Sequence, residues 1–142
     1  GRKIYIGNEG EMMKAFNAKD GYIISRCKDY DIFTAIITGR ISEIVSLRAK
    51  VLKVTDVFQG VTNKPVILNK IADKHDLTLE QIAYIGDDLN DLECMKLCGF
   101  SACPHDASKE VRDYVDYVCT NNGGDGAVRE FLDLMISKKL VE

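Results

Sequence analysis

Three carboxylates stand within five residues in the segment Gly86-Asp87-Asp88-Leu89-Asn90-Asp91, which directly follows the apolar run 82–85. A short apolar run that stops at a glycine is typical of a buried parallel strand. The carboxylates are therefore predicted at the carboxyl end of that strand, the edge where open α/β sheets bind ligands. Because like charges this close repel one another, they call for a counter-ion, and hard oxygen ligands favour Mg²⁺.

Two further polar motifs follow predicted strands. Thr38-Gly39-Arg40 ends the apolar run 32–37, and Lys64 follows Gln59-Gly60 at the start of a predicted helix. If the strands are neighbours, a hydroxyl, an ammonium and a carboxylate-held Mg²⁺ meet at one edge and form a phosphate site. Each motif also has a purely structural interpretation, as the end of a strand, a solvated lysine or carboxylates that favour a helix N-terminus.

Length and composition predict one globular domain, residues 1–142, with 46% hydrophobic and 29% charged residues. A net charge of −3 argues against a general nucleic-acid binder. No apolar run has the length of a membrane span and no signal-peptide pattern opens the sequence, so we expect a cytoplasmic protein without a membrane partner. The five cysteines form no CxxC pair and are interpreted as small buried hydrophobes of a reducing compartment.

Strands and helices alternate along the sequence, which predicts an α/β fold: a parallel sheet with helices on both faces. The expected strands are 32–37, 55–58, 82–85, 99–103 and 116–119, and the expected helices are 21–30, 42–52, 64–75, 90–97, 107–112 and 127–138. The extended segments 3–7 and 11–17 flank Asn8-Glu9-Gly10 and predict an N-terminal β-hairpin over about 3–17. The hairpin is the one piece outside the alternation.

In their order and spacing these motifs resemble those of the haloacid dehalogenase superfamily of phosphatases, and most of all its capless subgroup that acts on 3-deoxy-D-manno-octulosonate 8-phosphate. The resemblance covers essentially the whole chain and includes Lys14-Ala15-Phe16-Asn17, Asp20-Gly21 and Gly123-Gly124-Asp125-Gly126-Ala127-Val128-Arg129-Glu130. It implies a three-layer, Rossmann-like fold. It also implies Mg²⁺-dependent hydrolysis of a keto-sugar phosphate monoester through a phosphoaspartate, in the synthesis of lipopolysaccharide precursors.

The resemblance further implies roles for single residues. Thr38 would bind the transferring phosphoryl group and Lys64 would stabilise it, while Asp87 would be a direct Mg²⁺ ligand supported by Asp88 and Asp91. The residues expected to bind substrate are Lys14, Asp20, Gly39, Arg40 and Arg129. Relatives that act on nine-carbon keto-sugar phosphates can carry an acidic residue where Arg40 stands, so Arg40 favours the eight-carbon substrate.

Other roles remain open for three of these residues. Lys14 could be a solvated strand charge and Asp20 a helix cap, and Arg129 could pair with Glu130 or Asp133 on its own helix. The subgroup assembles as a tetramer, and its hairpin helps to build the assembly and shapes the neighbour's active site. The glycine-rich segment, here 123–126, closes over the active site. A homotetramer is therefore the expected assembly.

The family's first motif, Asp-x-Asp-Gly-x-x-x-Asp-Gly, holds the nucleophile and the acid/base, and it is not found in this sequence. Gly1 aligns just after that motif, so we expect the motif and the central strand that carries it to precede residue 1. Without that strand, the runs 32–37 and 82–85 would expose unpaired backbone groups.

Two other classes of protein fit parts of the pattern. One is a non-catalytic oligomerisation module of the same fold, as occurs fused to nucleotidyl-sugar synthetases, although such a module has no use for Thr38, Lys64 and Asp87. The other is a response-regulator-like receiver, which fits poorly with the late position of the Gly-Asp-Asp segment and with the glycine-rich tail.

Overall fold

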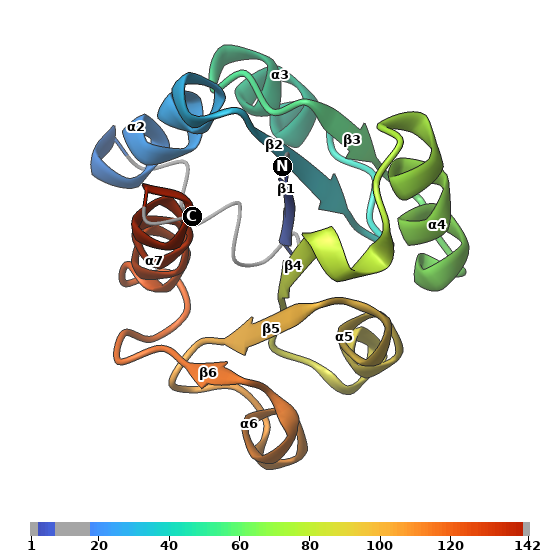
Figure 1. The fold of residues 1–142 in the computed structure, drawn as a ribbon, viewed down its shortest axis with the longest axis vertical. Coiled ribbons are helices and arrows are strands. Elements are labelled where there is room, and N and C mark those ends of the chain that lie inside the picture. Colours follow the sequence, from blue (N-terminus) through green and yellow to red (C-terminus); the bar gives the residue numbers. More distant parts are fainter. Residues whose placement is uncertain (1–2, 8–17, 141–142) are drawn as a thin grey trace.

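A parallel six-stranded sheet forms the centre of the molecule in the computed structural model, which describes residues 3–7 and 18–140. The strand order is β3-β2-β1-β4-β5-β6, so the chain winds outward from β1 in one direction and then returns to the other side of it (Figure 1). The strands are β1 (Lys3–Gly7), β2 (Ile32–Ile37), β3 (Asp56–Phe58), β4 (Ile82–Ile85), β5 (Phe100–Cys103) and β6 (Tyr117–Val118).

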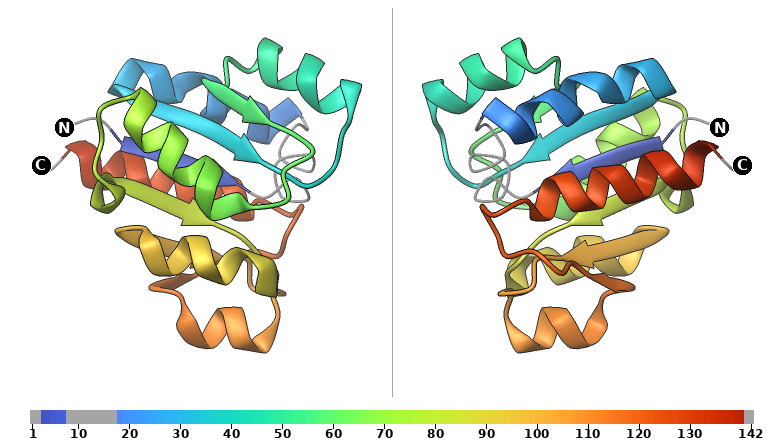
Figure 2. Two further views of the ribbon diagram at one scale, coloured as in Figure 1. Left: turned by 90° about the vertical axis from the view of Figure 1, so that its right-hand side faces the viewer. Right: turned by 90° about the vertical axis from the view of Figure 1, so that its left-hand side faces the viewer.

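Helices cover both faces of this sheet, as the alternation of elements predicts (Figures 1 and 2). One face carries α2 (Ala18–Arg26), α3 (Glu43–Val51) and α7 (Ala127–Leu140); the other carries α4 (Lys64–Lys74), α5 (Leu92–Leu97) and α6 (Lys109–Tyr114). Side chains of β4 alternate between the two cores, with Ala83 and Ile85 on the first face and Ile82 and Tyr84 on the second. The predicted α/β fold with three layers is confirmed.

The first strand is the clearest difference from the predicted fold. Residues 3–7 pair in parallel with both β2 and β4, and Gly7 lies opposite Ile36 on one side and Ile85 on the other. They do not act as an arm outside the sheet, and β2 and β4 do not lack a shared neighbour. An apolar extended segment fills this position because the two flanking strands would otherwise leave backbone groups unpaired. The second half of the predicted hairpin, 11–17, lies outside the described residues.

Capping side chains set where the helices near the site begin. The Ser42 hydroxyl accepts the Val45 N–H at the start of α3, and Asn63 Oδ1 accepts the Val66 N–H at the start of α4. Pro65 stands in the first turn of α4, where its missing N–H costs nothing. The predicted cap at Asp20 is wrong, because α2 already begins at Ala18.

The far end of α4 is held against the sheet by a buried charge. Asp56, at the start of β3, bonds the ammonium of Lys74 and lies 2.6 Å from His75 Nε2. The His75 ring stacks on Phe33 of β2 at 4.6 Å between centroids. These contacts fix the C-terminal end of α4, the helix whose first residue, Lys64, lies at the opposite edge of the sheet.

The predicted burial of the cysteines is confirmed for all but Cys98, which is half-buried. All five are free thiols and four are buried. Burial raises the pKa of Cys27, Cys94 and Cys98 to about 12, which keeps these thiols protonated and unreactive.

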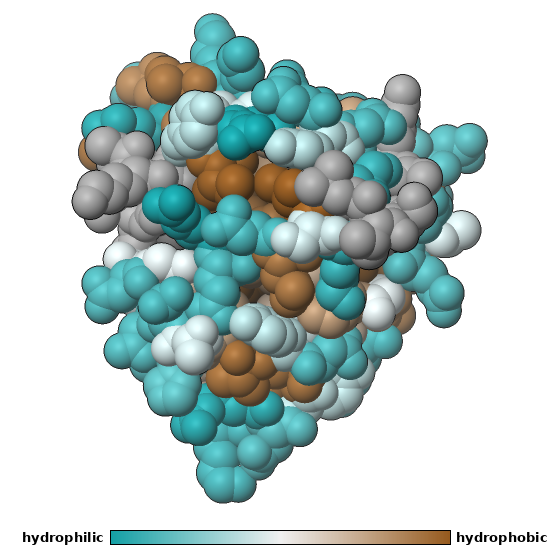
Figure 3. Space-filling view, turned by 60° about the vertical axis from the view of Figure 1, so that its left-hand side comes forward, coloured by the Kyte–Doolittle hydropathy of each residue, from teal (hydrophilic) through white to brown (hydrophobic). Residues whose placement is uncertain are grey.

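Hydrophilic residues predominate on the face in Figure 3, with apolar patches between them. Within the part of the chain that the structure describes, no helix has both the length and the apolarity needed to span a bilayer.

Candidate active site

Sheet register brings Thr38 and Asp87 to the same edge. Ile36 and Ile85 both lie opposite Gly7 of the central strand, and Thr38 and Asp87 each follow two residues later. This edge is the carboxyl end of the sheet at the point where the strand order reverses, which is where α/β folds bind their ligands.

The loop after β2 is bound to the loop after β3. Thr38 N–H donates to Phe58 O (3.0 Å), and Thr38 O accepts from Val61 N–H (3.0 Å). The Thr38 side chain is buried, and its hydroxyl oxygen accepts the Arg40 N–H at 3.1 Å. Gly60 N–H donates to Arg40 O, and Gly60 has a φ of +64°, a conformation that favours glycine. The two loops therefore form one rigid unit around Thr38.

Lys64 lies inside the molecule at the start of α4. Its side chain is 9% exposed, and its ammonium Nζ is 3.2 Å from Asp91 Oδ1, whose side chain is fully buried. A buried lysine is stable in its charged form when it is paired with a buried carboxylate. The interpretation of Lys64 as a solvated surface charge is therefore wrong.

Asp91 is bound from two sides. Its Oδ1 accepts from the Tyr84 hydroxyl at 2.6 Å as well as from Lys64. Its Oδ2 accepts the backbone N–H groups of Asp87 (3.2 Å) and Asp88 (3.3 Å). The carboxylate thus joins the lysine of α4, the core of the sheet and the loop that carries Asp87.

Gly86 makes this arrangement possible. A Cβ added at Gly86 would lie 2.5 Å from Asp91 Cγ and 2.6 Å from its Oδ2. Any other residue would push the carboxylate out of its place. The glycine at position 86 therefore has two roles: it ends the strand, and it leaves the space that the Asp91 carboxylate occupies.

The three carboxylates differ in their surroundings. Asp91 is paired with Lys64, and exposed Asp88 caps the following turn by accepting the Leu89 N–H at 2.8 Å. Asp87 is half-buried: burial raises its pKa, and the negative charges of Asp91, Asp88 and Asp106 raise it further. A crowded carboxylate of this kind fits a hard divalent cation.

The carboxylates do not gather around one point. No group of three or more metal-ligating side chains converges within the described ranges 3–7 and 18–140. The initial picture of three carboxylates sharing one counter-ion is therefore wrong for Asp91, whose counter-ion is Lys64. Asp87 is the carboxylate of this segment best suited to touch a metal.

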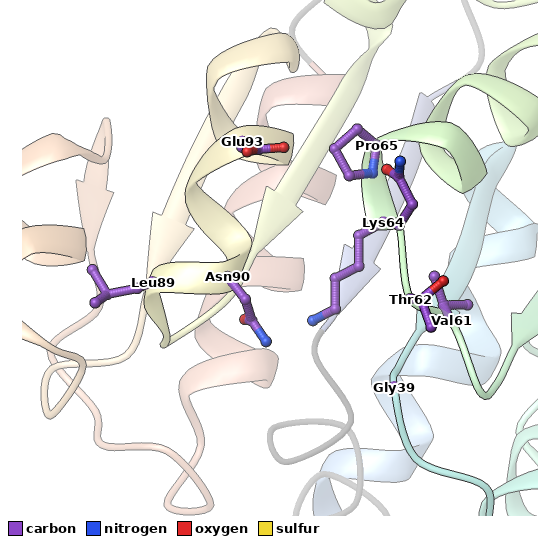
Figure 4. Close-up of a pocket in the computed structure, with 9 residues that line it drawn as sticks. Gly39, Val61, Thr62, Lys64, Pro65, Leu89, Asn90 and Glu93 are labelled. Carbon is purple, nitrogen blue, oxygen red and sulfur yellow. The ribbon is translucent and has the colours of Figure 1, made fainter.

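A cavity of about 430 Å³ opens between the starts of α4 and α5. Figure 4 shows the Lys64 side chain running from α4 toward Asn90, with Gly39 on the neighbouring loop. The residues that line the cavity are Gly39, Val61, Thr62, Asn63, Lys64, Pro65, Leu89, Asn90 and Glu93. Its mixed polar lining and its lysine suit a hydrophilic anionic ligand.

The glycine-rich segment 123–126 is anchored at the same edge. Gly123 N–H donates to Asp106 Oδ1 (2.8 Å), and His105 N–H donates to Asn121 O (3.0 Å). Glu130 of α7 holds the chain just before this segment. It accepts from the Tyr117 hydroxyl (2.5 Å), from Thr120 N–H and hydroxyl (both 2.9 Å), and from Asn121 N–H and Nδ2 (both 3.0 Å).

The structure brings four of the predicted site residues together at this edge: Gly39, Lys64, Thr38 and Asp87. Exposed Arg40 lies on the Thr38 loop. Arg129 lies in the first turn of α7, and its Nε is 3.8 Å from Asp133 Oδ2, one of the two pairings left open above. Lys14 and the side chain of Asp20 lie outside the described residues.

Sequence reasoning assigns no hydrogen-bonding role to three residues: Tyr84 and Gln59, which lie beside the site, and Glu130, which holds the chain between β6 and α7. Gln59 Oε1 accepts the Ser42 N–H and its Nε2 donates to Ser46 Oγ, both at 2.5 Å, so it fixes the loop after β3 to the start of α3. For Tyr84 a signal exists. A tyrosine inside a strand buried on both faces needs a partner for its hydroxyl, and the nearest polar motif contains Asp91.

Comparison with known proteins identifies the family. Residues 8–132 match the model of the haloacid dehalogenase-like hydrolases. The chain belongs to that family. Its predicted class of enzyme, a phosphatase of this family, is confirmed, and the receiver alternative is excluded.

Several members of the family are close in sequence and structure. The 3-deoxy-D-manno-octulosonate 8-phosphate phosphatase KdsC of Escherichia coli K12 is 42% identical over 133 residues, which cover 94% of this chain and 71% of the relative. The crystal structure of that phosphatase from Yersinia pestis has a TM-score of 0.89 at 35% identity, covering 99% of this chain and 84% of the other.

A second solved relative carries ligands. The Moraxella catarrhalis phosphatase, in complex with a magnesium ion, a phosphate ion and a KDO molecule, has a TM-score of 0.86 at 33% identity and covers 96% of this chain and 86% of the other. These relatives are named as phosphatases, and the alternative of a non-catalytic module is not supported.

Glu130 makes the stability of this protein depend on pH in the acidic range. Burial alone would raise the pKa of Glu130, but hydrogen bonds from Tyr117, Thr120 and Asn121 outweigh it and lower the pKa below its ordinary value of 4.5. The stabilisation by Glu130 is therefore fully present above pH 4.5 and is lost as the pH falls through the lowered pKa. We expect Glu130→Gln to lower the free energy of unfolding by about 1 kcal/mol at neutral pH.

Urea unfolding at neutral and at acidic pH measures this effect. The difference between wild type and Glu130→Gln should shrink below pH 4.5. The exposed Glu80 provides a control, and Glu80→Gln should change little at either pH. If Glu130→Gln lowers the free energy of unfolding by the same amount at both pH values, the lowered pKa of Glu130 is contradicted.

Proposed function

We propose that this protein hydrolyses 3-deoxy-D-manno-octulosonate 8-phosphate, with Mg²⁺ as its cofactor. One observation carries the proposal: Thr38, Lys64 and Asp87 lie at one sheet edge in a chain that is 42% identical to phosphatases named for this substrate. Those side chains supply a hydroxyl, an ammonium and a carboxylate, the groups that phosphoryl transfer requires.

The described residues account for binding and charge stabilisation. Lys64 provides a fixed positive charge beside the phosphoryl group, and the turn around Thr38 provides a rigid frame for hydrogen bonds to its oxygens. In this family an aspartate pair supplies the nucleophile and the acid/base. We propose that Asp87, Lys64 and Thr38 bind the metal and the phosphoryl group for this reaction, and that none of them is the nucleophile or the acid/base.

Asp87 is the described residue that would hold the metal. Burial raises the pKa of Asp87, the nearby negative charges raise it further, and a bound divalent cation would offset both effects. Asp88 and Asp91 would support the metal indirectly, because they fix the backbone of the loop on which Asp87 stands. Bound Mg²⁺ would supply neutralising charge at the phosphoryl oxygens.

The sugar would extend from the phosphoryl position into the cavity beside Lys64. Gly39 and Asn90 line that cavity, and exposed Arg40 lies one residue from Gly39, where it could meet the sugar carboxylate. Arg40 supports the eight-carbon substrate. Substrate contacts from Lys14, Asp20 and Arg129 remain part of this proposal, and they depend on the assembly of the subunits.

We further propose that the cytoplasmic enzyme works as a homotetramer. An apolar stripe formed by Ile41, Ile44, Leu47 and Val51 supports this, because its members are 84%, 61%, 58% and 70% exposed. Their spacing puts the three residues of α3 on the side opposite to buried Val45 and Ala49. Ile41 reaches the Gly60 turn, so a second copy on this stripe would border the active site.

Phosphate release from 3-deoxy-D-manno-octulosonate 8-phosphate by the full-length enzyme tests the activity, and Asp87→Asn tests the metal site. We expect Asp87→Asn to lower Mg²⁺-dependent turnover at least about 100-fold, because the direct metal ligand loses its charge. Without metal, the same variant should unfold at a higher temperature than wild type, because a crowded charge is gone. Addition of Mg²⁺ should raise the unfolding temperature of wild type and should not raise that of Asp87→Asn.

Asp76→Asn is the matched control for this experiment. Asp76 follows α4 at the opposite edge of the sheet with a φ of +54°, which asparagine also tolerates. It should leave turnover and the Mg²⁺ response unchanged. Near-normal turnover in Asp87→Asn would sink the metal assignment, and a wild type that prefers a nine-carbon keto-sugar phosphate would refute the proposed substrate.

Leu47→Arg tests the subunit contact. A charge in the apolar stripe should reduce the molar mass of the particle, measured by light scattering after gel filtration, because a desolvated charge opposes association. Leu97→Arg is the control, since Leu97 is 41% exposed on α5 at the other face of the sheet. A monomeric wild type would contradict the tetramer, and an unchanged mass in Leu47→Arg would rule out this stripe as the contact.

A further inference from the structure

Tyr84 is a polar-tipped side chain in the middle of the core. It is fully buried, and its ring packs with the core between the sheet and α4, α5 and α6. Its hydroxyl donates to Asp91 Oδ1 at 2.6 Å. A phenylalanine would fill the same apolar space without a polar atom, so filling the core does not explain the hydroxyl.

The hydroxyl shares its acceptor with the ammonium of Lys64. Both donate to Asp91 Oδ1, at 2.6 Å from Tyr84 and 3.2 Å from Lys64. The shorter bond comes from the neutral hydroxyl on strand β4, and the longer one from the ammonium of the lysine side chain. Tyr84 thereby takes part of the hydrogen-bonding capacity of Asp91 and keeps the carboxylate from drawing the lysine further inward.

The other oxygen of Asp91 fixes the loop of Asp87. Because Oδ2 accepts the N–H groups of Asp87 and Asp88, a rotation of the carboxylate would disturb both the loop and Lys64. Gly86 lets the carboxylate pack directly against the backbone, so the carboxylate has no room to move toward Gly86. The orientation of Asp91 therefore sets two parts of the site at once.

We propose that Tyr84 is a positioning residue for phosphoryl transfer: its hydroxyl orients Asp91, and Asp91 in turn places the Lys64 ammonium and the Asp87 loop. The proposal rests on the function proposed above. Tyr84 itself touches neither substrate nor metal. Its loss should affect the reacting phosphoryl group, whereas binding of the sugar should be unaffected.

Tyr84→Phe tests the proposal in the full-length enzyme. We expect kcat to fall between about 10- and 100-fold, because a small displacement of a catalytic charge has effects of that size. KM should change less than about 2-fold, because the sugar contacts are intact. Calorimetric titration with Mg²⁺ gives a readout without turnover, and the affinity should fall because the Asp87 loop is loosened.

Tyr117→Phe is a matched control, because Tyr117 also donates to a carboxylate, at 2.5 Å from Glu130 Oε2 on α7. Both variants lose one hydroxyl from a tyrosine–carboxylate pair, so both should unfold at a lower temperature. A purely structural role would give them the same kcat. The proposal is overturned if kcat and Mg²⁺ affinity of Tyr84→Phe equal those of Tyr117→Phe.

A second variant keeps the test decisive if Tyr84→Phe does not fold. Replacement of Tyr84 by 4-aminophenylalanine retains a donor at the same position and should keep kcat within about 2-fold of wild type. A folded 4-aminophenylalanine variant with a 10-fold lower kcat would overturn the proposal, because the donor would then not be the cause. An inactive wild type would refute the proposed function itself, which is a distinct outcome.

Discussion

The candidate site depends on a single buried carboxylate. Asp91 accepts from Lys64 and Tyr84 on one oxygen and from the backbone of Asp87 and Asp88 on the other. The position of this one carboxylate therefore determines three features of the site. It pairs with Lys64, it orients the loop that carries Asp87, and it needs the space left by Gly86. A buried ion pair gains little for stability relative to an apolar pair, so the benefit of this arrangement is that it holds a charged lysine in a defined place inside the protein.

Most of the fold could be predicted because its elements have strong local signals. The apolar run 82–85 and its terminal glycine gave β4 without error, and Ser42 and Pro65 marked the starts of α3 and α4. A turn sequence follows segment 3–7, so the local pattern predicts a hairpin there. The place of this segment between β2 and β4 depends on pairing with residues about 30 and 80 positions away, which no local pattern reports.

The sequence predicts which residues form the site, but only part of how they are arranged. Motif order indicates that Thr38, Lys64 and Asp87 share one edge. The sheet register places Thr38 and Asp87 there, and Lys64 lies beside them at the start of α4. The sequence could not show that Asp91 turns inward to Lys64, 27 residues away, because three adjacent carboxylates look alike until burial separates them. Nor could it separate the two partners of Arg129, since Glu130 and Asp133 are both close in sequence.

A double-mutant cycle on the Lys64–Asp91 pair tests the central claim most directly. Lys64→Met or Asp91→Asn alone leaves one charge buried without its partner, which costs about 3–5 kcal/mol. The double variant removes both charges, so its free energy of unfolding in urea should exceed the additive value by about 2 kcal/mol or more. Additive effects, with no coupling free energy, would contradict the claim that Asp91 holds Lys64 in the site.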